Sequence, residues 1–197
     1  TGKPASFLGS DYAGRTDTQI ARMLLIDAGV EEPNGKLIDA LIESYLLHLE
    51  YRIRDFPSRL LGNPRAAIED LRKKGATVGL GTGNVRKGAY LKLVSAGIGD
   101  LFDLNEGGFG EDGHTRAELL RAGALTLNPN SSFPIIVVGD TPRDVEGAHE
   151  IGAFCIGVPF KKNDRKALEA AGADAIVDCV DENISCVVKN LINIPKT

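Results

Sequence analysis

Two aspartates four residues apart are the part of the sequence that most clearly predicts chemistry. Asp140 comes directly after an apolar run at 134–139, and Asp144 falls in the first turn of a helix predicted to begin at Pro142. The run shows no alternation of apolar and polar residues, which is typical of a strand buried on both faces of a parallel sheet. The carboxyl end of such a strand is where open α/β sheets bind ligands. Two hard oxygen ligands there suit Mg²⁺, and Mg²⁺ suits phosphate chemistry.

A structural explanation of Asp144 stays open beside the metal site. Thr141 suits a helix N-cap, and Pro142 suits the first helical position because its missing N–H costs nothing there. An acidic residue at the third helical position can close a capping box with the N-cap residue. From the pair alone, metal binding and helix capping remain alternatives.

A second group of polar residues, Thr82, Gly83 and Asn84, follows a predicted strand at 77–81. Backbone N–H groups at the start of the next helix, together with the Thr82 hydroxyl, could hold phosphate oxygens. The alternative is that Asn84 is a plain N-cap and Thr82 a turn residue.

A basic residue, Arg116, opens the helix predicted at about 115–127, just before the strand that ends at Asp140. A fixed guanidinium near a metal and a phosphate would neutralise the charge that develops in a transition state. Taken alone, an arginine in a first helical turn is more often a surface residue.

The elements that must position these residues change character near residue 60. Before it, apolar spacing predicts two helices, one from Thr16 to about Ala28 and one from Gly35 to about Leu49, and no strand. After it, helices and strands alternate: helices at 64–74, 85–96, 115–127, 142–151, 164–171 and 183–192, strands at 77–81, 135–138, 154–158 and 175–177, and a short apolar segment near 101–104. This order predicts an α/β fold, a Rossmann-like parallel sheet with helices on both faces. The expected organisation is an all-helical module at 1–60 and an α/β core at 61–197.

The composition predicts an ordinary globular protein of the cytoplasm. The chain has 197 residues, of which 43% are hydrophobic and 25% are charged. A net charge of −4 gives no electrostatic footprint for nucleic acid or for an anionic membrane. The three cysteines lack metal-ligand spacing, so we expect thiols in a reducing cytoplasm and no cysteine nucleophile.

The order of these motifs is more specific than any one of them. Thr82-Gly83-Asn84, then Arg116, then Gly-Asp-x-x-x-Asp resembles the haloacid dehalogenase superfamily, and within it the phosphoglycolate-phosphatase-like hydrolases. The resemblance covers essentially the whole chain. It implies that Thr82 hydrogen-bonds the transferring phosphoryl group, that Arg116 is the basic residue of the third motif, and that Asp140 and Asp144 hold Mg²⁺. It also implies that residues 1–60 are a helical cap that closes over the site and sets substrate choice.

One departure from the family's pattern concerns the nucleophile. The family's first strand ends in an Asp-x-Asp motif, whose first aspartate attacks phosphorus and whose second is the general acid/base. No such motif occurs in this chain. Asp11 is the nearest candidate, but no sustained apolar strand precedes it and Ala13 stands where the acid/base should be. We therefore expect the natural protein to have a further N-terminal segment that carries the motif.

The resemblance implies a Mg²⁺-dependent phosphatase that hydrolyses a small phosphorylated metabolite through an aspartyl-phosphate. Thr82, Gly83, Asn84 and Arg116 would bind the substrate, with Thr82, Arg116 and Asp140 in catalysis. A catalytically silent relative that binds a phosphorylated ligand or a protein, and a phosphomutase of the same superfamily, remain alternatives. Neither nucleic acid nor a membrane is an expected partner, and the oligomeric state, with a homodimer as one option, stays open.

Overall fold

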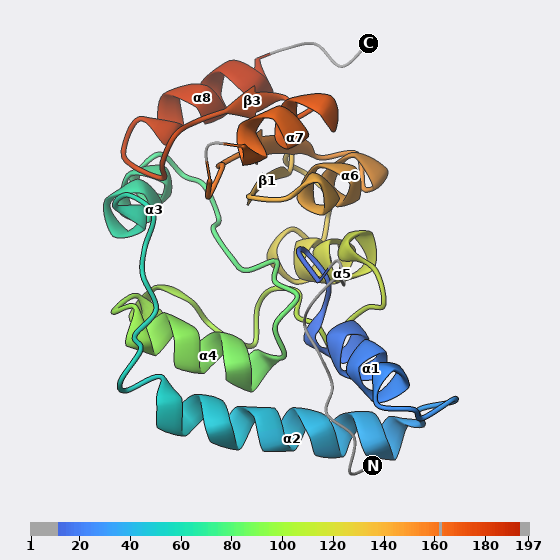
Figure 1. Cartoon of the computed structure of the whole chain (residues 1–197). Helices are drawn as coiled ribbons and strands as arrows, with labels where there is room; N and C mark the ends of the chain where they lie inside the picture. Colours follow the sequence, from blue (N-terminus) through green and yellow to red (C-terminus); the bar gives the residue numbers. More distant parts are fainter. Residues whose placement is uncertain (1–11, 162, 194–197) are drawn as a thin grey trace.

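A parallel sheet organises the C-terminal part of the chain in the computed structural model, which describes residues 12–161 and 163–193 (Figure 1). Its strands are β1 (Ile136–Gly139), β2 (Phe154–Gly157) and β3 (Ala175–Ile176), in the order β1-β2-β3. All pairings are parallel, and Val137 of β1 lies opposite Cys155 of β2. The alternation of strand and helix along the chain explains this topology, because parallel neighbours require a crossover connection.

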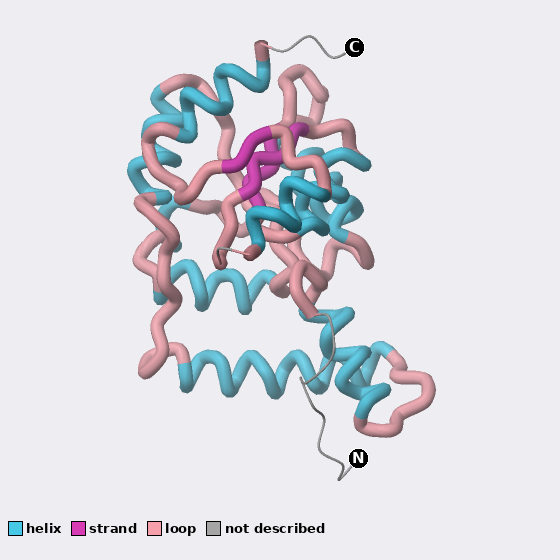
Figure 2. The backbone as a smooth tube through the Cα atoms, turned by 45° about the horizontal axis from the view of Figure 1, so that its top comes forward, coloured by secondary structure: helices cyan, strands magenta, loops and turns pink. Residues whose placement is uncertain are grey.

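Helices cover both faces of this sheet (Figure 2). The helices of the described residues are α1 (Asp17–Asp27), α2 (Gly35–Arg52), α3 (Pro64–Lys73), α4 (Arg86–Ser95), α5 (Arg116–Leu127), α6 (Pro142–Glu150), α7 (Asp164–Ala170), α8 (Ile184–Ile192) and the 3₁₀ helix η1 (Gly99–Leu101). Cys155 is buried with Val145 of α6 and Leu168 of α7. The next residue, Ile156, is buried on the other face with side chains of α3 and α8. The predicted α/β class, with a parallel sheet between helices, is confirmed.

Capping residues begin the helices close to the positions that the sequence predicts. Thr16 closes a capping box with Gln19 at the start of α1, and Thr115 does the same with Glu118 at the start of α5. The Asn34 side chain accepts a hydrogen bond from the backbone at the start of α2. Such caps satisfy N–H groups that have no partner inside the helix. α2 packs against α1 and α4, and it lies at the opposite end of the molecule from the sheet (Figures 1 and 2).

The predicted strand at 77–81 is wrong. A single parallel bridge, between Gly81 and Gly108, is the only strand-like pairing of this segment among the described residues. Within the same residues β1 has one neighbour, β2, and Val138 on β1 is 44% exposed. An extended segment without partner strands has no ladder to stabilise it. Of the apolar segment at 101–104, only Leu101 belongs to the 3₁₀ helix η1, and this residue packs into a small core cluster with α3.

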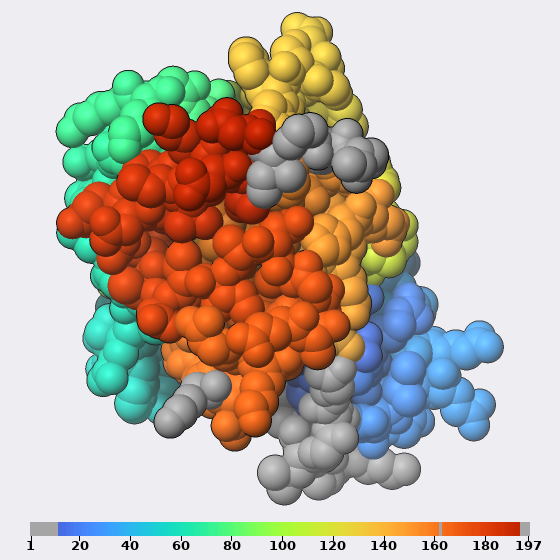
Figure 3. All heavy atoms as spheres, turned by 90° about the horizontal axis from the view of Figure 1, so that it is seen from above, coloured from blue at the N-terminus to red at the C-terminus, as the bar shows by residue number. Residues whose placement is uncertain are grey.

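The view from above shows a broad face made by the C-terminal third of the chain, with the N-terminal helices at its margin (Figure 3). No helix in the described part of the chain is both long and apolar enough to span a membrane.

Replacing Ile156 with alanine tests the two-faced core. The side chain is fully buried between β2 and the helices α3 and α8, so its loss leaves a cavity. We expect Ile156→Ala to lower the free energy of unfolding by about 3 kcal/mol in urea denaturation. Ile26→Ala is the matched control, because Ile26 is 48% exposed, and its change should stay within about 0.5 kcal/mol. Equal effects of the two substitutions would contradict this description of the core.

Candidate active site

Asp140 follows the last residue of β1 and lines a cleft of about 560 Å³ at the carboxyl edge of the sheet. Other lining residues come from the start of α6, among them Arg143, and from the segment after β2, among them Phe160 and Lys161. The predicted position of Asp140 at a strand end is confirmed. The cleft has a size typical of small-molecule sites and carries both acidic and basic side chains.

The environment of Asp140 opposes its ionisation. Desolvation raises the pKa of this carboxyl above its ordinary value of 3.8, and the negative charge of Asp144 raises it further. Among the described residues, the Asp140 carboxylate makes no hydrogen bond or ion pair with another residue. A carboxylate with these properties is available to a cation or a ligand in the cleft.

Asp144, in contrast, is fully engaged by the protein. It is 5% exposed, and its Oδ2 accepts hydrogen bonds from the N–H groups of Asp140 at 3.2 Å and Thr141 at 3.0 Å. The Thr141 hydroxyl donates to the same oxygen at 2.7 Å. Gly139 leaves room for this arrangement, since an added Cβ would lie 2.5 Å from Asp144 Cγ. The structure therefore gives Asp144 the capping role, and its role as a metal ligand stays a prediction.

Arg116 is the first residue of α5, as predicted, and it pairs with the buried carboxylate of Asp144. Its Nε lies 3.1 Å from Asp144 Oδ1, and both side chains are about nine-tenths buried. Its Nη2 donates to the backbone oxygen of Gly14 at 3.2 Å. Nε is buried without a well-directed hydrogen bond in the described structure. Arg116 thus lies behind the Asp140 turn and is not among the lining residues of the cleft.

The Thr82 loop has an internal hydrogen-bond network of its own. Thr82 Oγ1 accepts from the backbone N–H of Asn84 at 3.2 Å and from its side-chain Nδ2 at 2.8 Å. The ammonium group of Lys92 on α4 donates to Asn84 Oδ1. The alternative of Asn84 as an N-cap is wrong, because Val85 occupies that position and has no capping side chain.

Asp17 supplies the missing cap of α4 from a distant part of the sequence. Its Oδ2 accepts from the N–H of Val85 at 2.9 Å, and its own N–H donates to the Gly83 oxygen at 2.7 Å. Burial is the main cause that raises the pKa of the Asp17 carboxyl. The described contacts of the Asp17 carboxylate thus show helix capping. The helix that it caps is α4, whereas Thr16 caps α1.

The segment 14–17 joins the two groups of predicted site residues. A Cβ added to Gly14 would lie 2.6 Å from Thr141 Oγ1, and one added to Gly83 would lie 2.5 Å from the Arg15 oxygen. The structure brings Arg116, Asp140 and Asp144 together directly, and it connects them to Thr82 through this segment.

Other candidates add little to the site. Within the described residues no three His, Cys, Asp or Glu side chains are grouped to hold a metal. Asp11, the nearest candidate for the nucleophile, lies outside the described residues. Burial raises the pKa of Cys155 to about 12, so this thiol is a poor nucleophile at neutral pH.

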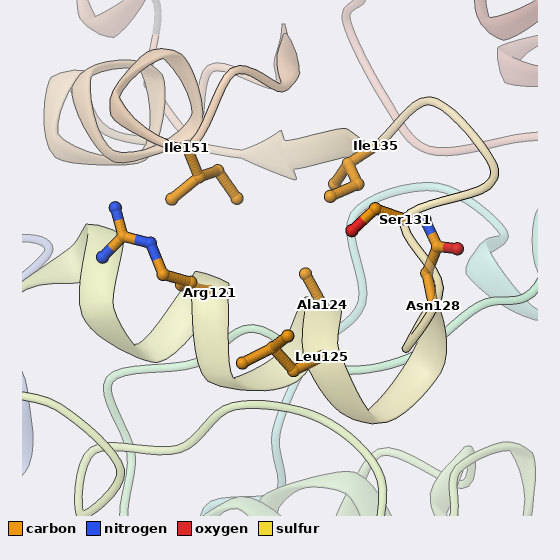
Figure 4. Close-up of a pocket in the computed structure, with 7 residues that line it drawn as sticks. All are labelled: Arg121, Ala124, Leu125, Asn128, Ser131, Ile135 and Ile151. Carbon is orange, nitrogen blue, oxygen red and sulfur yellow. The ribbon is translucent and has the colours of Figure 1, made fainter.

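A second, smaller cavity of about 130 Å³ lies at the other end of β1 (Figure 4). Ile135, just before β1, and Ile151, just after α6, face Ala124 and Leu125 of α5 across it. Since ligands of open α/β sheets bind at the carboxyl ends of the strands, this cavity is separate from the candidate active site.

Sequence reasoning missed Lys92 and Lys161. The sequence around Lys161 indicates only a solvated basic loop, and nothing in it places this residue in the cleft with Asp140. Lys92 lies eight residues from Asn84, more than two helical turns away, so spacing within a helix gives no signal of their contact. An acidic residue in a first helical turn is a local signal for Asp17, but it does not show which helix the carboxylate caps.

The chain is similar to known proteins in its sequence and in its fold. A family model described as haloacid dehalogenase-like hydrolase matches residues 10–158. A phosphoglycolate phosphatase of Synechococcus elongatus is 25% identical over 122 residues, which are 62% of this chain and 56% of that protein. The chain thus matches little more than half the length of this relative. A crystal structure assigned to a beta-phosphoglucomutase of Thermotoga maritima has a TM-score of 0.56 and 22% identity, over 96% of this chain and 86% of that chain, and this likeness concerns the fold.

Replacing Asp140 with asparagine should stabilise the protein at neutral pH. Because the pKa of Asp140 is raised in the folded state, ionisation of this carboxyl favours the unfolded chain as the pH rises through that pKa. The asparagine side chain cannot ionise, so we expect Asp140→Asn to be more stable than the wild type at pH 7, with the difference vanishing below about pH 3.8. Urea denaturation with a metal chelator, from pH 3 to 7, measures this. A difference that does not change with pH would contradict it.

Removing Asp144 should leave Arg116 as an uncompensated buried charge. We expect Asp144→Ala to lower the free energy of unfolding by about 3 kcal/mol, and the double variant with Arg116→Met to lose less than the sum of the two single changes. The matched control is Asp178→Ala, because Asp178 is 89% exposed in its ion pair with Arg165, and such pairs contribute at most about 1 kcal/mol. Strict additivity of the Asp144 and Arg116 substitutions would show that the pair does not act as a unit.

Proposed function

Since the chain belongs to the haloacid dehalogenase-like hydrolase family, we propose that it is a Mg²⁺-dependent phosphatase of a small phosphomonoester. One observation carries the proposal: the carboxylate of Asp140 faces a cleft at the carboxyl edge of the sheet and has no partner among the described residues. The neighbouring Asp144 is paired with Arg116, whereas Asp140 stays open to the cleft, which Glu146 and Asp164 also line. Family membership also confirms the resemblance that Thr82, Arg116 and the two aspartates indicated.

The residues of the cleft fit a hydrated divalent cation. Mg²⁺ in phosphate-handling sites is usually held by one or two carboxylates, with waters and substrate oxygens completing its coordination. Asp140 would hold it, and Asp144 Oδ1, whose charge already acts on Asp140, would be the second acidic oxygen. When bound, the ion supplies Lewis-acid polarisation of a phosphoryl oxygen.

The protein's own groups would hold the phosphoryl group and its charge. Lys161 and Arg143 line the cleft and give it basic side chains that suit an anionic substrate. The Thr82 hydroxyl would donate to a phosphoryl oxygen, with Gly83 and Asn84 shaping the same loop, while Arg116 pairs with Asp144 behind the site.

The attack on phosphorus would follow the family's two-step route. The carboxylate of an aspartate would attack phosphorus and break the ester P–O bond, so that the alcohol leaves with a proton and an aspartyl-phosphate forms; water would then hydrolyse the aspartyl-phosphate, restoring the carboxylate and releasing inorganic phosphate. The expected Asp-x-Asp motif is not in the sequence, so we assign this nucleophile to no described residue. Because Lys161 and Arg143 of the cleft would also suit an anion that is bound without turnover, a second candidate is a catalytically silent protein that binds a phosphorylated ligand in the same cleft.

The substrate class follows from the size of the cleft and from the relatives. A volume of about 560 Å³ suits a small metabolite, and one relative is a phosphoglycolate phosphatase.

We further propose that α1 and α2, within residues 1–60, form a cap over the core at 61–197, and that this cap sets substrate choice. The three free cysteines suit a reducing cytoplasm.

A phosphate-release assay tests the enzyme against the silent binder. We expect release from a panel of small phosphomonoesters that requires Mg²⁺ and stops with a chelator. Asp140→Ala should lower kcat at least about a thousandfold, because it removes the proposed metal ligand. Glu150→Gln, an exposed residue on the same helix, is the control and should keep wild-type activity. Undiminished turnover by Asp140→Ala would refute the metal role, and phosphate binding without turnover by the wild type would favour the silent binder.

A further inference from the structure

Lys92 lies directly behind the Thr82 loop. This half-buried residue of α4 donates from Nζ to Asn84 Oδ1. Nζ also lies 5.9 Å from the centre of the Tyr45 ring of α2, and the carboxylate of Asp17 is close enough to interact with its charge. Contacts from two other helices thus hold one ammonium group against the side chain of Asn84.

The chemistry of these groups fixes the orientation of the Asn84 amide. An ammonium group can only donate hydrogen bonds, so the end of the amide that faces Lys92 must be its oxygen. The NH₂ end must then face Thr82, and Nδ2 lies 2.8 Å from Thr82 Oγ1. The orientation of a side-chain amide is normally decided by such a network of neighbours.

The orientation of Asn84 in turn decides what Thr82 can do. Thr82 Oγ1 accepts from both the backbone N–H and the side-chain NH₂ of Asn84, which occupies both of its acceptor positions. The hydroxyl proton then has to point elsewhere, and no acceptor for it occurs among the described residues. A ligand oxygen can take that place.

We propose that Lys92 is a positioning residue that makes the Thr82 hydroxyl an obligatory donor toward a phosphoryl oxygen. This proposal rests on the proposed function of the cleft. Without the ammonium group, the Asn84 amide can rotate by half a turn and present its oxygen to Thr82. The hydroxyl would then donate to Asn84, and it would be lost to the ligand.

A double-mutant cycle with inorganic phosphate as the probe tests this chain of contacts. Titration calorimetry in the presence of Mg²⁺ should show phosphate binding weakened about tenfold by Lys92→Met, the loss expected for one hydrogen bond. Lys92→Arg restores a donor and should bind within about threefold of the wild type. In a Thr82→Val background, Lys92→Met should cause no further loss, because the hydroxyl through which it acts is gone.

The matched control is Lys87→Met on the same helix. Lys87 is exposed and pairs with Glu50 of α2, so its removal changes charge and helix contact without touching the Thr82 loop. Phosphate binding should be unchanged. An equal loss from Lys87→Met, or a loss from Lys92→Met that is the same with and without the Thr82 hydroxyl, would overturn the proposal.

A second readout does not depend on phosphate. The side-chain NH₂ protons of Asn84 should be protected from exchange in the wild type and in Lys92→Arg, and exposed in Lys92→Met, when followed by NMR. Unaltered Asn84 signals in Lys92→Met would overturn the positioning role. Signals that depend on Lys92 in a protein that binds no phosphate would support the positioning role and contradict the proposed function.

Discussion

The buried carboxylate of Asp144 requires partners for every lone pair, because a charge removed from water is stable only where donors and a counter-charge replace its hydration. The turn after β1 supplies backbone and hydroxyl donors to one oxygen, and Arg116 of α5 faces the other. The same guanidinium donates to Gly14. Segments more than a hundred residues apart therefore meet at one ion pair, and the position of Asp140 depends on it.

This pairing gives two aspartates of the same turn opposite properties. Asp144 is paired with backbone and hydroxyl donors and with Arg116, whereas Asp140 has no such partners among the described residues and lies next to the Asp144 carboxylate. Desolvation and the negative charge of Asp144 raise the pKa of Asp140, and a bound cation would offset both effects. Because Asp144 is paired with Arg116 and Asp140 is not, the unpaired carboxylate of this turn is that of Asp140. This difference is a stronger argument for a cation site at Asp140 than two unpaired carboxylates would be.

Whether a feature could be predicted from the sequence depends on how far apart in the chain the interacting residues lie. The capping boxes at Thr16 and Thr115 act within four residues, so the helix starts were predictable. The segment 77–81 has the composition of a strand, but a strand requires neighbours, which no local pattern shows. The two roles of Asp144 could not be separated, because capping and metal binding both call for an acidic residue at that position. The contact of Asp17 with α4 spans 68 positions in the sequence, so no local pattern shows it.

The Thr82 loop depends on helices outside the α/β core. Asp17 of α1 holds the start of α4 by a hydrogen bond to Val85, and Tyr45 of α2 contacts Lys92, which orients Asn84. A displacement of α1 or α2 relative to the core would loosen the cap of α4 or the ammonium group. Either change would alter the donors around Thr82. The Asp140 turn is connected to the same N-terminal segment, because Arg116, which pairs with Asp144, also donates to the backbone oxygen of Gly14. Both groups of site residues therefore depend on the position of residues 14–17.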